Sequence, residues 1–167
     1  MKNLSNLKTK RYSLENNTLE LYVKKSPFIG RVFILLLAFI SVALPLLGMF
    51  FRLQERGSFH ILFIVGLGLF SLMSFFFIRL FLWNTYGKEV IEIGSETITY
   101  YVDYHYFKGN QKEIAYNSLT YAIANIGFKE EKIGHLILAA SDNVYIESAV
   151  NMDLQDLNEI IILLKER

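Results

Sequence analysis

Two long runs of apolar residues dominate the pattern of the chain. The first, Val32–Phe51, reads VFILLLAFISVALPLLGMFF and carries no charge. The second, Phe59–Trp83, carries Arg79 as its only Lys, Arg, Asp or Glu. At a rise of about 1.5 Å per residue, each run is roughly 30 Å long as a helix, which is the thickness of the hydrocarbon layer of a bilayer. The pattern therefore predicts transmembrane helices at 32–51 and 59–83.

Two alternative structures for these runs fit the chain less well. Buried helices of a soluble protein would need a larger water-soluble core than the remaining residues can supply. A signal peptide is disfavoured because about thirty mostly polar residues precede the first run, and no small-residue cleavage pattern follows it.

The segment 52–58, RLQERGS, is too short to hold a domain, so it predicts a tight turn between antiparallel helices. Basic residues are more numerous on the outer flanks of the two runs than in this turn, which places both termini in the cytoplasm and the turn on the other side. The expected location is the inner (cytoplasmic) membrane. The residues predicted at the membrane interface are Lys24, Lys25, Arg31, Arg52, Arg56, Arg79 and Trp83.

Small residues recur on one face of each run. Such residues let helix backbones approach closely in lipid, and we favour packing within the hairpin over a seam between copies. No Asp, Glu or Lys lies within either run, which disfavours an ion or substrate path. The small residues are Ala38, Ser41, Pro45 and Gly48 in the first run and Gly68 and Ser71 in the second.

The remaining residues alternate in the manner of β-strands. Before the hairpin, 18–25 places Leu19, Leu21 and Val23 on one face, after a polar N-terminal tail at 1–17. After it, turn signals at 94–95 and 109–110 separate further runs rich in β-branched and aromatic residues. These predicted strands are 89–93, 97–102 with a continuation at 104–107, 111–116, 119–126, 135–140 and 144–147.

The chain ends in an amphipathic helix. Asp153 is a suitable N-cap, and Leu154, Leu157, Ile161 and Leu164 fall on one face. Residues 88–167 should therefore form, with 18–25, an α+β domain of about seven antiparallel strands and one C-terminal helix.

Charge is divided unevenly along the chain, although the net charge is only +1. Residues 1–58 hold nine Lys and Arg against three Asp and Glu, whereas 84–167 hold seven against thirteen. An acidic domain repels phosphate backbones, so nucleic acid is not an expected partner.

This order of elements resembles that of bacterial membrane proteins with two transmembrane helices and a pleckstrin-homology-like (PH-like) domain, a family largely of unknown function. The resemblance is carried by the two apolar runs, by WNTYGKEVIEIGSETITYY at 83–101 and by ESAVNMDLQDLNEIIILLKER at 147–167. It implies a strongly bent antiparallel sheet closed by the C-terminal helix. It also implies that the hairpin replaces the loop whose basic residues bind phosphoinositides in other PH domains, with Lys24, Lys25 and Arg31 remaining there.

The residue types give little sign of chemistry. The chain has no cysteine, and its three histidines, His60, His105 and His135, lack a second His at metal-ligand spacing. No phosphate-binding, nucleophile-elbow or zinc-protease motif occurs. Asp103 and His105 are two apart on a predicted strand without a nucleophile beside them. We therefore predict no catalytic residue, cofactor, metal or small-molecule substrate.

An aromatic cluster at 100–107 includes Tyr101, Tyr104 and Tyr106, which form the predicted partner surface because tyrosine is favoured at interfaces. Packing in the core or at the membrane is the alternative for these side chains. The first functional hypothesis is a membrane-anchored, non-enzymatic interaction module that binds the bilayer and a protein partner or another copy. The second is a structural subunit or assembly factor bound through the hairpin. A membrane enzyme is a third, less favoured hypothesis.

Overall fold

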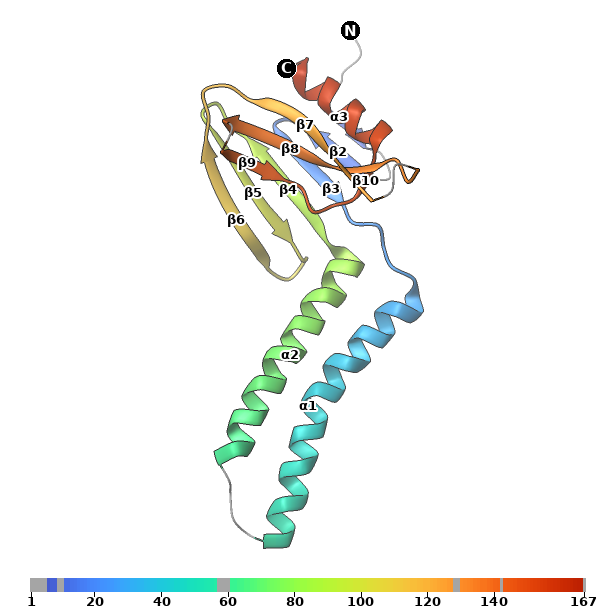
Figure 1. Cartoon of the computed structure of the whole chain (residues 1–167), viewed down its shortest axis with the longest axis vertical. Helices are drawn as coiled ribbons and strands as arrows, with labels where there is room; N and C mark the ends of the chain where they lie inside the picture. Colours follow the sequence, from blue (N-terminus) through green and yellow to red (C-terminus); the bar gives the residue numbers. More distant parts are fainter. Residues whose placement is uncertain (1–5, 9–10, 57–60, 128–129, 142, 167) are drawn as a thin grey trace. The chain divides into compact units, whose positions relative to one another are not determined.

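A computed structural model describes residues 6–8, 11–56, 61–127, 130–141 and 143–166. The chain divides into two compact units. One combines both ends of the chain, Met1–Lys24 and Tyr86–Arg167, and is called here the β-rich domain. The other, Lys25–Thr85, is called the helical hairpin. The architecture is α+β, with two long apolar helices, antiparallel sheets and a C-terminal helix (Figure 1).

The hairpin consists of α1, Phe28–Arg56, and α2, Ile61–Tyr86. Both helices extend beyond the apolar runs that predicted them. Helix α1 begins at Phe28 because the residues before Val32 are also apolar or tolerant of helix, and it continues through Pro45 and into the segment predicted as a turn. Residues 57–58 of that turn, Phe59 and His60 lie outside the described residues.

The first sheet of the β-rich domain has six antiparallel strands in the order β1-β2-β3-β4-β5-β6. Alternation explains its buried face, since Leu19 and Leu21 point inward from β3, and Ile98, Tyr100 and Val102 from β5. The strands are β1 Asn6–Lys8, β2 Tyr12–Glu15, β3 Thr18–Tyr22, β4 Lys88–Ile93, β5 Thr97–Asp103 and β6 Lys108–Ala115.

The pairing of β3 with β4 joins the two halves of the chain. Thr18 lies opposite Glu92 and Tyr22 opposite Lys88. The ladder continues one step further, where the Val23 amide donates to the Gly87 carbonyl at 3.1 Å. The entire hairpin is therefore an insertion between two neighbouring strands of one sheet.

The second sheet has the order β10-β8-β7, with β9 paired to β8. Its strands are β7 Thr120–Ile126, β8 Ile133–Ser141, β9 Val144–Glu147 and β10 Met152–Asp153. Helix α3, Leu154–Lys165, follows directly and packs on this sheet. The core of the domain is formed by inward side chains of both sheets and of α3, including Leu14, Ile91, Leu136, Met152 and Ile160.

Several boundaries differ from those that the sequence predicted. The tail at 1–17 contains β1 and β2, and residues 152–153 form β10, so the described residues hold ten strands and not about seven. The expected strand continuation at 104–107 is a turn, closed by a hydrogen bond from the Tyr104 amide to the Phe107 carbonyl at 3.0 Å. The expected turn at 109–110 instead lies inside β6, opposite a register shift in β5.

The predicted face of the C-terminal helix is partly correct. Leu157 and Leu164 are buried, whereas Leu154 and Ile161 are only half-buried, and Ile160 and Leu163 take their place. Asp153 occupies the N-cap position but makes no capping hydrogen bond with its side chain. Its carboxylate accepts a hydrogen bond from Arg11 at 3.3 Å instead.

Joining Val23 to Gly87 through an Asn-Gly turn removes the hairpin and should leave a water-soluble, folded domain, because β3 and β4 then form an ordinary β-hairpin. Circular dichroism and size-exclusion chromatography check this result. Residues 87–167 alone serve as the control. They lack β2 and β3 and leave Ile91 uncovered, so they should not unfold cooperatively. Equal stability of the two variants would contradict the pairing.

Candidate functional site

The hairpin presents an apolar surface along both helices. Phe28–Gln54 and Ile61–Tyr86 are long and apolar enough to cross a membrane, and each contains an 18-residue stretch whose mean hydropathy is 2.7 or 2.6, respectively. Of the thirty large apolar side chains exposed in the described part of the chain, five lie in the β-rich domain, which leaves twenty-five on the hairpin. The surface is therefore concentrated on one unit.

The residues predicted at the membrane interface fall near the ends of the two helices. Lys24 and Lys25 are exposed just before α1, and half-buried Arg31 lies in its first turn. Arg79 and Trp83 occupy the last two turns of α2. Arg52 and Arg56 lie at the other end of α1, and the side chain of Arg56 is outside the described residues.

Hydrogen bonds tie the start of α1 to the end of α2. The Ser26 hydroxyl donates to Asn84 Oδ1 at 2.5 Å, and the Ser26 amide donates to the Asn84 carbonyl at 3.3 Å. These contacts hold the two helix ends that lead into the β-rich domain side by side.

The helices approach each other closely at three small residues. Ala38, Ser41 and Ser74 are all buried, and the Ser74 hydroxyl donates to the Ala38 carbonyl at 2.9 Å. Of the predicted small residues, Ala38 takes part in this hydrogen bond, whereas the hydroxyl of buried Ser41 donates to the Leu37 carbonyl of its own helix at 2.8 Å. Gly48 and Gly68 face open space.

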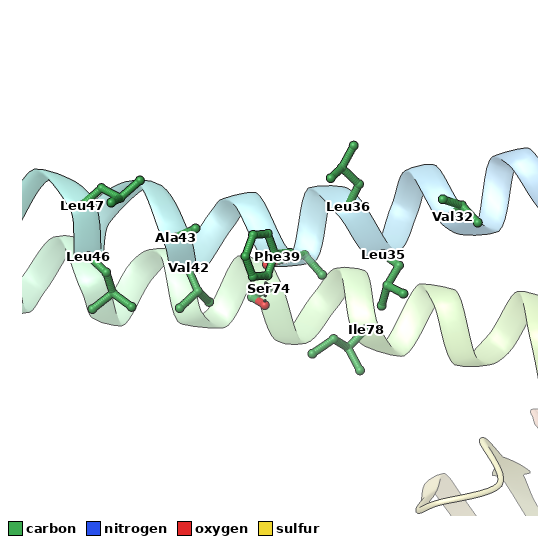
Figure 2. Close-up of a pocket in the computed structure, with 11 residues that line it drawn as sticks. Val32, Leu35, Leu36, Phe39, Val42, Ala43, Leu46, Leu47, Ser74 and Ile78 are labelled. Atoms are coloured by element: carbon green, nitrogen blue, oxygen red, sulfur yellow. Dashed lines mark hydrogen bonds between the residues drawn. The ribbon is translucent and has the colours of Figure 1, made fainter.

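An apolar groove of about 980 Å³ runs beside this contact. Figure 2 shows Ser74 as its polar residue among aliphatic and aromatic side chains. A groove of this composition can accept hydrocarbon, either an acyl chain or the side chains of another apolar helix. Its lining residues are Val32, Leu35, Leu36, Ala38, Phe39, Val42, Ala43, Leu46, Leu47, Ser74 and Ile78.

The three tyrosines of the predicted partner surface do not form one patch. Tyr104 is buried and its ring stacks on Phe107 at 4.8 Å between centroids. Tyr101 is half-buried, donates to Glu92 at 3.1 Å, and has the Lys108 ammonium 4.1 Å above its ring. Tyr106 is the exposed member, with 73% of its surface accessible.

Tyr106 belongs instead to a cluster that the sequence did not reveal, made of Tyr86, His105 and Tyr106 and called here the loop cluster. The rings of Tyr86 and His105 stack at 5.1 Å, and Tyr106 meets them edge-on at 6.5 and 4.9 Å. His105 has a φ of 79°, a left-handed conformation that costs energy for a residue with a Cβ. A hydrogen bond of 2.7 Å from its amide to Asp103 Oδ1 supports this conformation.

The buried carboxylate of Glu89 links the first sheet to the segment after β9. It accepts hydrogen bonds from the Tyr100 hydroxyl at 2.6 Å and from the amides of Ala149 and Val150 at 2.7 and 3.3 Å. Burial raises the pKa of Glu89, and these hydrogen bonds oppose the shift. Burial, with the adjacent Glu89 carboxylate, also raises the pKa of Tyr100. The alternation in EVIEI places Glu89 on the same face as Ile91, which is the signal that could have found it.

A second polar network lies on the outer side of the second sheet. His135 Nδ1 is 3.2 Å from Glu147 Oε1, and His135 Nε2 is 2.7 Å from Asn151 Oδ1. Arg11 donates to the Asn151 carbonyl at 2.5 Å. The network therefore fastens the same segment, residues 148–151, that Glu89 holds from inside.

Both networks hold backbone segments of the β-rich domain together. Within the described ranges, no group of three or more His, Asp or Glu residues could hold a metal ion. Asp103 Oδ1 accepts the hydrogen bond from the His105 amide, and Asp103 Oδ2 lies 3.7 Å from the Lys88 ammonium. No family model, curated protein or solved structure matches the chain. Similarity therefore assigns it neither a family nor an activity.

Replacing Glu89 tests the link between the two sheets. Glu89→Leu should lower the free energy of unfolding by about 3–5 kcal/mol, because three donors lose their buried acceptor. Glu89→Gln keeps an acceptor and should cost less. Urea unfolding of the domain lacking the hairpin gives both values, and Glu92→Gln, at an exposed position of the same strand, is the matched control.

The difference in stability between the wild type and Glu89→Gln should change with pH in a defined direction. Folding raises the pKa of Glu89 above its ordinary value of 4.5, so between these two values the native state binds more protons than the unfolded state. The contribution of Glu89 to the free energy of unfolding therefore falls as the pH rises through the folded pKa. The stability of the wild type relative to Glu89→Gln should therefore decrease as the pH increases from about 4.5. A difference that increases over this range would contradict the raised pKa.

Proposed function

We propose that this protein is a membrane-anchored, non-enzymatic interaction module that presents a PH-like domain at the cytoplasmic face of the inner membrane. The observation that supports this proposal best is the pairing of β3 with β4 across the hairpin. It makes the membrane anchor part of the domain's own connectivity.

The exposed surface of the hairpin supports insertion in lipid. Transfer of a fully exposed large apolar side chain from water to hydrocarbon is favourable by about 1.5–3 kcal/mol. At half exposure, the twenty-five such residues of the hairpin would gain roughly 20–40 kcal/mol on insertion. This gain exceeds the whole folding stability of a typical domain, about 5–15 kcal/mol.

The strand pairing also supports a common side for both helix ends. Neighbouring strands lie about 4.8 Å apart, so α1 must start close to where α2 ends. With both ends on one side, the turn at 52–58 lies on the other. Basic residues at Lys24, Lys25 and Arg31 favour the cytoplasm for the domain.

The PH-like assignment remains part of the proposal. Antiparallel sheets followed by a C-terminal helix that packs on the second sheet support it. So does the position of the hairpin after β3, where the resemblance places it. The two N-terminal strands β1 and β2 are an addition to the expected pattern.

The interaction role is supported by the kind of polar groups that the β-rich domain contains. Its polar contacts, buried at Glu89 and partly exposed at His135, join one strand or loop to another and hold the fold. Exposed Tyr145 on β9 offers contact surface for a protein partner or a second copy.

The groove beside Ser74 favours a second candidate function, a structural subunit or assembly factor that binds a membrane complex through its hairpin. An apolar groove in lipid can accept a helix of another subunit, and the tight contact at Ala38 keeps its shape.

Because the chain has no cysteine, single substitutions report the topology without background. Ser58→Cys should react with a membrane-impermeant maleimide in intact cells. Ser95→Cys, in the exposed connection between β4 and β5, should react only after the membrane is opened. The opposite pattern would reverse the orientation, and reaction of both residues in intact cells would exclude the hairpin from the membrane.

Cross-linking in native membranes followed by purification separates the two candidate functions. An interaction module predicts that the domain with Val23 joined to Gly87 retains the partner of the full chain. A subunit bound through the hairpin predicts loss of that partner. In the second case, Ser74→Phe in the full chain should also abolish binding, whereas Ser71→Phe, at an exposed position of the same helix, should not.

A further inference from the structure

We infer that the loop cluster of Tyr86, His105 and Tyr106 is a membrane-contacting surface that inserts into the headgroup layer of the bilayer, as a second attachment of the β-rich domain. This inference rests on the proposed function, since it requires α2 to cross the membrane. The occupant of the surface is the boundary between headgroups and acyl chains, and not a protein.

The turn between β5 and β6 consists of four consecutive aromatic residues, Tyr104–Phe107. They divide into an inner and an outer pair. Tyr104 and Phe107 stack on each other and are buried or half-buried, while their backbones close the turn. His105 and Tyr106 point outward and are exposed. The inner pair thus anchors the turn in the domain and the outer pair is presented to the surroundings.

Tyr86 ties this turn to the membrane anchor. It is the last residue of α2 and the first residue of the C-terminal part of the β-rich domain. Trp83 marks the membrane interface on α2, and Tyr86 follows about 4.5 Å further along the helix axis. The headgroup layer of each leaflet is roughly 5–7 Å thick. Tyr86 therefore lies within this layer when α2 spans the membrane.

The distances within the loop cluster keep the turn close to Tyr86. The Tyr106 ring lies 6.5 Å from that of Tyr86, and the His105 ring lies 5.1 Å from it. Both separations are similar to the thickness of the headgroup layer, so we infer that the turn enters this layer beside Tyr86. Tyr106 exposes 73% of its surface and Tyr86 exposes 47%, so neither side chain is buried in the core of the domain.

The chemistry of the cluster matches this layer. Tyrosine is enriched at both membrane interfaces because its ring is apolar and its hydroxyl can stay hydrated. Residues 104–107 contain no Asp, Glu, Lys or Arg, so insertion of this turn removes none of these charges from water. The left-handed backbone of His105 is already fixed by Asp103, so little further ordering is required for insertion.

Tryptophan fluorescence tests this inference in the full-length protein reconstituted into phosphatidylcholine vesicles. Trp83 is the only tryptophan, so Trp83→Phe provides a silent background. Tyr106→Trp in this background should be quenched several-fold more strongly by lipid with a nitroxide on the headgroup than Tyr145→Trp. Tyr145 is the matched control because it is an exposed tyrosine of the same domain, on β9.

Three outcomes would overturn the inference. Equal quenching at positions 106 and 145 would place the loop cluster in water. Protection of the Tyr106→Trp indole that depends on protein concentration and not on labelled lipid would indicate a second copy. A requirement for added phosphatidylglycerol would indicate recognition of charge in place of interfacial insertion. A nitroxide on Tyr106→Cys, with depth measured by oxygen and nickel accessibility, decides the question if the tryptophan variant does not fold.

Native Trp83 separates this inference from the proposed function. Quenching of Trp83 in the unmodified protein shows that α2 is in the membrane, whatever happens at position 106. A quenched Trp83 together with an unquenched Tyr106→Trp variant rejects the loop contact alone. Absence of quenching at both positions rejects the membrane anchor and the loop contact together.

Discussion

The antiparallel pairing of β3 with β4 is the constraint on which the rest of the structure depends. These strands are neighbours in one sheet although the whole hairpin separates them in the chain. Hydrogen bonds between neighbouring strands fix the distance between the points where the chain leaves and re-enters the domain. The helices can therefore only run out and back as a pair, and the contact between Ser26 and Asn84 keeps their ends together.

A polar link inside the β-rich domain has a comparable role. Glu89 lies in the strand that follows the hairpin, and its carboxylate binds the backbone of residues 149 and 150. A buried carboxylate is expensive to desolvate, so it is an unusual choice for a purely structural contact. Because Glu89 lies within the β3–β4 pair, the strand that joins the two halves of the first sheet also fixes the segment that leads into β10 and α3.

The sequence was most informative where one physical signal dominated over a long stretch. Twenty uncharged residues between Arg31 and Arg52 predict a long apolar helix, and α1 contains all of them. Helix ends were less well predicted because α1 continues through Arg52, beyond the apolar pattern. Strand β2 was missed because YSLE is too short to show a period. Tyr12 of β2 is buried near Glu159 of α3, which is distant in the sequence. Burial and the Glu159 carboxylate raise the pKa of Tyr12 to about 12.

The candidate surfaces also include residues that the sequence located and residues that it did not. The basic residues beside the hairpin could be found by counting charges, because their placement follows from the length of the helices. The tyrosines of 101–106 could not be sorted into buried and exposed members. A turn at 104–107 and a register shift near Tyr101 break the simple alternation that sorting requires. The stacking of Tyr86 on His105 joins residues from separate elements and has no local signal.

The insertion of the hairpin within a sheet also sets the order of events during synthesis. Sixty-five residues, 23–87, must be made after β3 before its partner β4 appears. At about 5–20 residues per second, the ribosome needs roughly 3–13 s for them. Throughout this interval β3 has an unpaired edge and Leu19 and Leu21 lack their cover. The β-rich domain can therefore close only after both helices have been synthesised, which couples its folding to completion of the hairpin.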